Sequence, residues 1–145
     1  NKYAQWLHST WGNVSSLDFA GFMSRDKLQD TYASTDCLVF PSRIETWGLP
    51  ISEFLPYNRP MLLSDLPFAH ETAAGAGAVG FFDPSSAVAL ADTMERVLRG
   101  DYTQLKPVPQ HPLQAPSARS WSELFELLLS DDEATQSNSF TQPTP

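Results

Sequence analysis

Three short apolar runs limit the folds that are open to this chain. They have the length and continuous apolarity of strands buried on both faces of a sheet, and they span residues 37–40, 60–64 and 79–82. Residues 16–21 alternate between apolar and polar side chains, which predicts one more strand ahead of them. Each run is followed by a segment with helical character: residues 24–33, 50–55, 66–72 and 87–99. Strand–helix alternation with short turns predicts an α/β fold, a Rossmann-like parallel sheet with helices on both faces.

The two ends of the chain have a different character. Residues 1–11 place apolar side chains at a helical spacing, and residues 117–129 do the same. Residues 106–116 contain too many prolines for regular structure and predict an extended strap. Residues 130–145 are acidic and then rich in Ser, Thr, Gln and Pro, which predicts a disordered tail. We therefore expect one domain over residues 1–129 and a tail over 130–145.

Charge and cysteine content exclude several functions. The 145 residues carry 17 acidic and 9 basic side chains, a formal charge of −8. Nucleic acid is therefore excluded as a partner, and membrane association is at most peripheral, because both surfaces require clustered Lys and Arg. The single cysteine, Cys37, lies in an apolar run and is interpreted as a core residue. No apolar stretch has transmembrane length, so the sequence predicts a cytoplasmic protein.

The candidate site lies between the 37–40 strand and the helix that begins near Pro50. Two carboxylates, Glu45 and Glu53, flank this connection with seven residues between them. Backbone amides at the helix start are expected to be free to bind an anion, and Glu53, expected in the first helical turn, to accept hydrogen bonds from a neighbouring diol such as a ribose. A simpler alternative is that Glu53 only complements the helix dipole and Glu45 is only solvated. Spacing alone leaves both open.

These residues resemble a known signature. Residues 45–53 (Glu-Thr-Trp-Gly-Leu-Pro-Ile-Ser-Glu) look like the E-x7-E motif of retaining GT-B glycosyltransferases of the GT4 group, the glycosyl transferases group 1. Further stretches resemble family patterns in the same order and at the same spacing: residues 19–22, 28–42, 58–60, 64–71 and 80–84. The similarity covers about residues 17–98.

The resemblance implies a role for each matching residue. Glu53 would bind the ribose hydroxyls of the donor, and Glu45 would contact and position the transferred sugar as the catalytic residue. The amides that would contact sugar hydroxyls and diphosphate belong to Thr46, Trp47, Gly48 and Leu49. The nucleobase would pack near Gly21, Phe22 and Met23.

The resemblance also implies what the reaction needs. The substrate would be a nucleotide-diphosphate sugar, with no cofactor and no metal, and the three histidines have no ligand spacing. A hexose would pass to a glycan or glycolipid in polysaccharide- or lipopolysaccharide-type biosynthesis. The family binds the acceptor with an N-terminal domain and neutralises the diphosphate with an Arg…Lys pair, and neither is recognisable here. We therefore expect a C-terminal GT-B half-domain, incomplete at its N-terminal side and inactive alone.

Two alternatives remain. The chain could be a non-catalytic module that docks on a partner subunit through the aromatic side chains Tyr3, Trp6 and Trp11. It could also be another GT-B activity, such as a sugar-phosphate phosphorylase or a nucleotide-sugar epimerase, although the Glu45–Glu53 spacing favours the GT4 type.

Overall fold

A parallel sheet forms the centre of the first of two compact units, Asn1–Pro109 and Gln110–Pro145. The computed structural model describes residues 1–110, 117, 118 and 120–136. The sheet has three strands, β1 (Leu38–Phe40), β2 (Met61–Ser64) and β3 (Val79–Phe82), in the order β1-β2-β3. All pairs are parallel, with Leu38 opposite Met61 and Met61 opposite Val79. The three apolar runs are thus confirmed as strands, and the α/β class with them.

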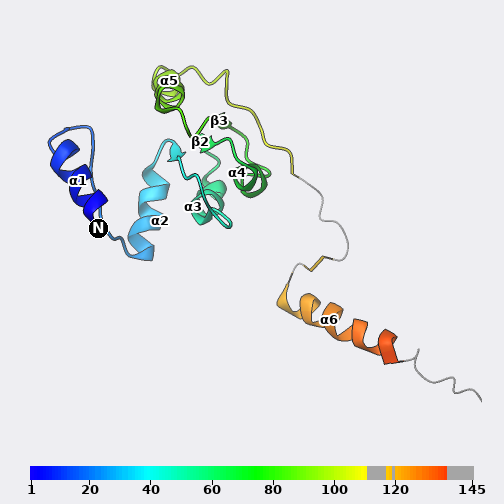
Figure 1. Ribbon diagram of the computed structural model, residues 1–145. Helices are drawn as coiled ribbons and strands as arrows, with labels where there is room; N and C mark the ends of the chain where they lie inside the picture. The colour runs from blue at the N-terminus through cyan, green and yellow to red at the C-terminus, as the bar shows by residue number, and fades with distance from the viewer. Residues whose placement is uncertain (111–116, 119, 137–145) are drawn as a thin grey trace, which may run out of the picture. The chain divides into compact units, whose positions relative to one another are not determined.

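The helices of this unit follow the predicted alternation. They are α1 (Lys2–Trp11), α2 (Arg25–Ser34), α3 (Leu49–Phe54), the 3-10 turn η1 (Leu55–Tyr57), α4 (Pro67–Thr72) and α5 (Ala87–Leu98) (Figure 1). Ser24 caps α2 through its side chain, as expected from its preference for that position. The α3 helix ends before Pro56, and Asn58 then adopts the left-handed conformation, φ 49°, that reverses the chain into β2.

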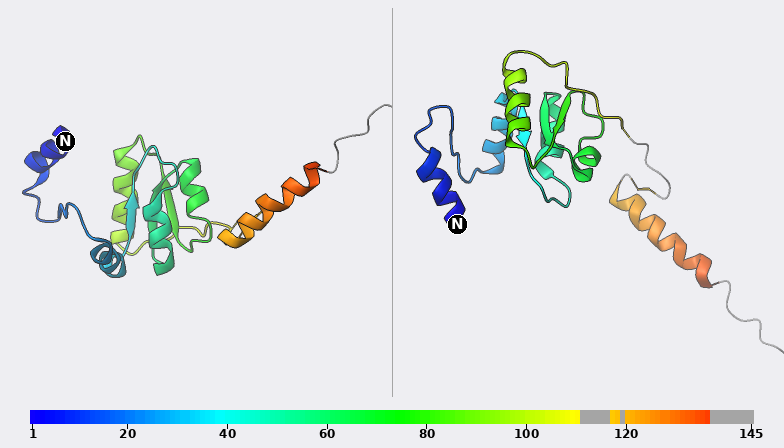
Figure 2. Two further views of the ribbon diagram at one scale, coloured as in Figure 1. Left: turned by 90° about the horizontal axis from the view of Figure 1, so that it is seen from below. Right: turned by 45° about the horizontal axis from the view of Figure 1, so that its top comes forward.

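Helices cover both faces of the sheet (Figure 2). Because side chains alternate along a strand, β2 sends Met61 and Leu63 to one face and Leu62 to the other. On the first face they pack with side chains from α2, α3, α4 and the residue after α4, namely Tyr32, Ile51, Phe54, Ala69 and Ala73. On the second face Leu62 and Phe82 pack against Leu90 and Val97 of α5. The first face holds most of the buried core and fixes α2, α3 and α4 relative to the sheet.

The strand predicted over residues 16–21 is absent from the described structure. Leu17 donates its amide to the carbonyl of Val14 in a turn, and Phe19 packs its ring on His8 with centroids 4.4 Å apart. An alternating segment becomes a strand only when it can pair with a neighbour. Here the segment pairs with no strand of residues 1–110, so the prediction was wrong.

The proline-rich segment that starts at residue 106 was predicted to be an extended strap, and its first residues are extended along the sheet. Lys106 forms an antiparallel bridge with Val79, and Val108 donates its amide to the carbonyl of Ala76. Residues 111–116 of this strap lie outside the described residues.

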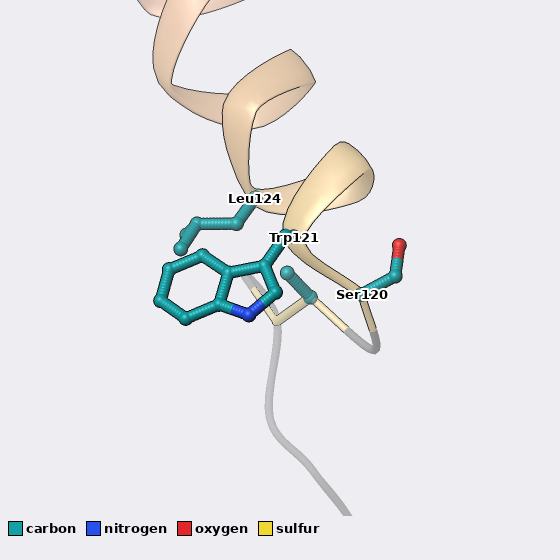
Figure 3. A pocket seen from close by; sticks show the side chains of 4 residues that line it. Ser120, Trp121 and Leu124 are labelled. Atoms are coloured by element: carbon teal, nitrogen blue, oxygen red, sulfur yellow. The ribbon is translucent and has the colours of Figure 1, made fainter.

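The second unit contains α6 (Trp121–Gln136), which begins later and ends later than predicted. Ser120 accepts a hydrogen bond from the amide of Glu123, which is a helix-capping contact and explains the start at Trp121. Trp121 and Leu124 project on one side of the helix and Ser120 on another, around a shallow pocket also lined by Ala118 (Figure 3). The helix continues beyond Leu129 through residues predicted to be disordered, and the rest of that tail, residues 137–145, lies outside the described residues. The division at residue 129/130 remains a prediction.

Candidate functional site

The predicted site loop lies where β1 ends and α3 begins. Gly48 has φ +79° and ψ 55°, the left-handed conformation that glycine adopts at little cost, and it immediately precedes the first residue of α3. Gly48 is buried, and an added Cβ would lie 3.2 Å from Cδ1 of Ile51 and 3.4 Å from Cδ2 of Phe68. The loop therefore requires glycine here both for its backbone conformation and for its close approach to α3 and α4.

A second contact fixes the same loop to α4. The hydroxyl of Thr72, 5% exposed, donates a hydrogen bond to the carbonyl oxygen of Trp47. The Trp47 side chain itself is half exposed. Sequence reasoning missed Thr72, because it appeared only as the last residue of a short helix. With Phe68 against Gly48 and Thr72 on Trp47, α4 supports the loop that carries the candidate amides.

Glu45 lies on the solvent-exposed side of this loop. Its Oε1 accepts a hydrogen bond from Oγ of Ser42 at 2.9 Å, and that hydroxyl also lies 3.3 Å from the carbonyl oxygen of Ile44. One serine hydroxyl has a single proton, so it can satisfy only one of these acceptors well at a time. Glu45 is accordingly held close to its own loop and remains accessible to a ligand.

The sequence had predicted Glu53 in the first turn of α3, but the structure places it beyond that turn. Because Gly48 is the N-cap, α3 starts at Leu49 and its first turn has no acidic residue. Glu53 is half-buried, and its Oε2 accepts a hydrogen bond from the hydroxyl of Tyr32 on α2 at 3.3 Å. This position weakens the alternative in which Glu53 merely complements the helix dipole, since that effect falls off within the first turn.

Fewer backbone amides are free at the start of α3 than the sequence had predicted. The amide of Ile51, predicted to be free, donates to the carbonyl oxygen of Gly48 at 2.9 Å. The Ser52 hydroxyl also bonds within the helix, donating to the Leu49 carbonyl oxygen at 2.9 Å. The Ile51 amide is thus already bonded, and the candidate amides for an anion are those of residues 46–49.

The third group of predicted site residues immediately precedes α2. Gly21 has φ +66°, and Phe22 exposes 99% of its surface. Met23 is half-buried, and its sulfur lies 3.6 Å from the Thr31 hydroxyl, whose oxygen is also 2.8 Å from the carbonyl oxygen of Lys27. The apolar ring of Phe22 is thus free to pack against a flat ligand.

The predicted residues do not converge on one described cavity. Glu45 and Glu53 each bond to a different hydroxyl, Ser42 and Tyr32. A groove of about 190 Å³ lies against α5 on the other face of the sheet, and a neighbouring one of about 470 Å³ lies beside Arg59; neither is lined by these glutamates. The assignment of site residues stays a prediction.

One pair of polar side chains near the same edge was not anticipated as a pair. Asp65, directly after β2, accepts a hydrogen bond at Oδ1 from Nε2–H of the His70 ring, with 2.7 Å between the two atoms. The His70 ring also stacks on Phe81, with centroids 3.8 Å apart. Within the described residues no three His, Cys, Asp or Glu side chains gather as metal ligands would. That the reaction uses no metal stays a prediction.

A parallel sheet with a carboxylate-bearing loop at the carboxyl end of a strand defines an α/β protein of the kind that binds ligands at that edge. Comparison with known families makes the assignment specific: the sequence model of the glycosyl transferases group 1 matches residues 8–110. The match covers most of the chain, which therefore belongs to this family. Comparisons with curated proteins and with solved structures gave no match.

Family membership supports glycosyl transfer as the activity, with a nucleotide-sugar donor and an acceptor as substrates. The resemblance seen in the sequence is confirmed at this level. In the part of the chain that the structure describes, every helix is too short or too polar to cross a membrane.

Proposed function

We propose that this chain is the donor-binding, C-terminal GT-B part of a retaining GT4-type glycosyltransferase, which moves a hexose from a nucleotide-diphosphate sugar to a glycan or glycolipid. One observation carries the proposal: in a group 1 glycosyl transferase, Glu45 lies in the connection from β1 to α3 and Glu53 lies within α3, directly after that connection's glycine-led helix start. Acceptor binding is assigned to a separate N-terminal domain. The reaction is assigned to polysaccharide- or lipopolysaccharide-type biosynthesis in the cytoplasm.

Glu53 is assigned to the ribose. Its carboxylate is half-buried and already oriented by one hydrogen bond, which leaves lone pairs for the two ribose hydroxyls. Hydrogen bonds to a charged group contribute roughly 1.5–3 kcal/mol each, so losing both would remove roughly 3–6 kcal/mol from the binding free energy of about 8 kcal/mol that corresponds to micromolar affinity.

Glu45 and the loop amides are assigned to the transferred sugar and the diphosphate. Glu45 is exposed and therefore accessible to sugar hydroxyls, and its hydrogen bond from Ser42 restrains the carboxylate. Amides of Thr46, Trp47, Gly48 and Leu49 would donate to sugar and phosphate oxygens. Phe22 would pack against the base, and burying such a ring contributes about 1.5–3 kcal/mol.

The reaction proposed is front-face substitution at the anomeric carbon, with no cofactor and no metal. The bond from this carbon to the diphosphate oxygen breaks, and the acceptor hydroxyl oxygen forms the new bond on the same face. The acceptor proton passes to the departing phosphate. Within this chain, residues bind and orient the donor, and we expect the 145 residues alone to give no turnover.

Calorimetry with a panel of UDP-, GDP- and TDP-sugars tests the proposal. We expect at least one to bind, Glu53→Gln to weaken that binding by about tenfold or more, and Phe22→Ala to weaken it less. The matched control is Glu95→Gln on α5, which removes an exposed glutamate paired with Arg99 and leaves the affinity unchanged. Absence of binding across the panel, or equal affinities for wild type and Glu53→Gln, would contradict the proposal.

A docking module is the second candidate, and α1 is the observation that favours it. This helix has no buried residue, and its Tyr3 and Trp6 stack on each other with centroids 5.6 Å apart while remaining exposed. A pure docking module would bind none of the nucleotide sugars, so the same calorimetry separates the two functions.

A further inference from the structure

The Tyr32 hydroxyl is in an unusual position for a core aromatic side chain. Tyr32 is 7% exposed and belongs to the main hydrophobic cluster, yet its hydroxyl reaches Glu53 Oε2 across 21 positions of sequence. The bond joins α2 to α3, two helices that share one face of the sheet (Figure 1). Glu53 is the residue assigned above to the donor ribose, so a core residue contacts a candidate binding residue directly.

Packing fixes where that hydroxyl lies. The Tyr32 ring meets Phe54 edge-on, with centroids 5.7 Å apart and planes at 69°, and lies 6.2 Å from the ring of Tyr57. An aromatic ring enclosed in this way has little rotamer freedom, so its hydroxyl is a fixed donor. Glu53 is a flexible and only half-buried side chain, and a fixed donor restricts the directions in which its carboxylate can point.

The Tyr32 hydroxyl is in the protonated state that a hydrogen-bond donor to Glu53 requires. Burial raises the pKa of Tyr32 above its ordinary value, and the nearby charge of Glu53 raises it further, so the hydroxyl keeps its proton at neutral pH. At 3.3 Å the bond is longer than the 2.5–2.7 Å or so typical of a hydroxyl bound strongly to a carboxylate. A bond of this length adds little to the stability of the fold, but its hydroxyl lies close enough to restrict the directions open to the Glu53 carboxylate.

Tyr57 provides an internal comparison. Its hydroxyl donates toward Gln29, 2.9 Å from Oε1 and 3.2 Å from the backbone carbonyl oxygen, and so also joins the α3 region to α2. Its ring lies in the same aromatic group, 5.8 Å from Phe54. Tyr57 thus shares the packing and the helix-joining role of Tyr32 but does not contact a glutamate.

We propose that Tyr32 is a positioning residue for the donor site: its hydroxyl holds the Glu53 carboxylate in the direction in which it receives the ribose hydroxyls. This inference rests on the proposed function and adds a residue that acts through Glu53 and does not itself touch the substrate. A preorganised carboxylate binds more tightly, because less side-chain freedom is lost when the ligand arrives.

The test compares Tyr32→Phe with Tyr57→Phe in the full chain. The probes are UDP and GDP, each measured by calorimetry against its 2′,3′-dideoxy counterpart, which lacks the hydroxyls that Glu53 would bind. We expect Tyr32→Phe to weaken ribonucleotide binding by about three- to tenfold, the equivalent of one ordinary hydrogen bond, and to leave dideoxynucleotide binding unchanged. Tyr57→Phe should change neither affinity.

A second variant tests the same coupling by changing Glu53 instead of Tyr32, and then both together. Glu53→Asp shortens the side chain so that the carboxylate no longer reaches Tyr32, and adding Tyr32→Phe to it should cost no further affinity. The inference is overturned if Tyr32→Phe binds ribonucleotides as wild type does, or loses affinity equally for dideoxynucleotides, or adds to Glu53→Asp. If Glu53→Gln loses binding while Tyr32→Phe does not, only this inference fails. If wild type binds neither ribonucleotide, this inference fails, and the proposed function fails with it when no sugar of the UDP, GDP and TDP panel binds either.

Discussion

Replacing Gly48 by alanine tests the claim that the site loop depends on one backbone conformation. Gly48 and Gly100 have almost the same φ, +79° and +78°, but different surroundings. An added Cβ at Gly100 meets nothing within 4 Å, whereas at Gly48 it lies 3.2 Å from Cδ1 of Ile51. Gly100→Ala therefore measures the cost of the left-handed conformation alone, and the difference between the two variants measures the contact.

The magnitudes follow from these two terms. An L-residue in the left-handed region costs about 1–2 kcal/mol, which is the whole effect expected at Gly100. At Gly48 the neighbour is Ile51, which is completely buried and cannot move aside freely. Forcing a methyl group into such packing costs roughly 1–3 kcal/mol more, so Gly48→Ala should lose about 2–5 kcal/mol of a total stability of roughly 5–15 kcal/mol.

The assay is urea unfolding of wild type and both variants, followed by nucleotide-sugar calorimetry below the transition. The midpoint should fall more for Gly48→Ala than for Gly100→Ala with the urea slope unchanged, and only Gly48→Ala should weaken donor binding. Equal losses of stability for the two variants would refute the close packing of this loop. Unchanged donor affinity in Gly48→Ala would refute its place in the site.

Three further predictions follow from contacts elsewhere. Thr72→Val removes the hydrogen bond to the Trp47 carbonyl, so it should lower the free energy of unfolding in urea by about 1 kcal/mol and weaken donor binding. The control Thr93→Val removes a hydrogen bond within α5 and should leave donor binding unchanged. Equal losses of donor binding in the two variants would contradict the role of α4 as a support. Phe54→Ala should cost roughly 3–5 kcal/mol in thermal unfolding, and Leu98→Ala, at a side chain 85% exposed, under about 0.5 kcal/mol; a small loss at Phe54 would contradict its place in the core. Burial raises the pKa of the Cys37 thiol to about 11, so its alkylation by iodoacetamide should be slow at neutral pH and rise up to that pH; a rate that levels off near pH 8.5 or so would contradict its burial.

The strands were predictable because their signal is local. Four-residue apolar runs bounded by turn residues, such as residues 79–82, are typical of strands inside a covered sheet, and the structure buries three of those four residues. The segment at residues 16–21 has an equally clear alternation but no strand to pair with in the described chain. Whether such a segment becomes a strand depends on a neighbour, which sequence periodicity does not report.

The candidate site was predictable in its location and less so in its geometry. The E-x7-E spacing marked the connection from β1 to α3, and Pro50 marked the start of the helix within one residue. The position of Glu53 within the helix was wrong, because the left-handed Gly48 sets where α3 begins. Tyr32 and Thr72 were missed as site supports because each lies more than 20 positions from its partner, and such contacts exist only after the sheet has assembled.

The most direct test of donor binding at this edge is amide NMR of the ¹⁵N-labelled chain during titration with the nucleotide sugar selected by calorimetry. The account predicts the largest shifts at the loop amides from Thr46 to Leu49, with smaller ones next to Phe22. Shifts confined to α5, around Met94 and Leu98, or the absence of shifts at saturating ligand, would contradict it.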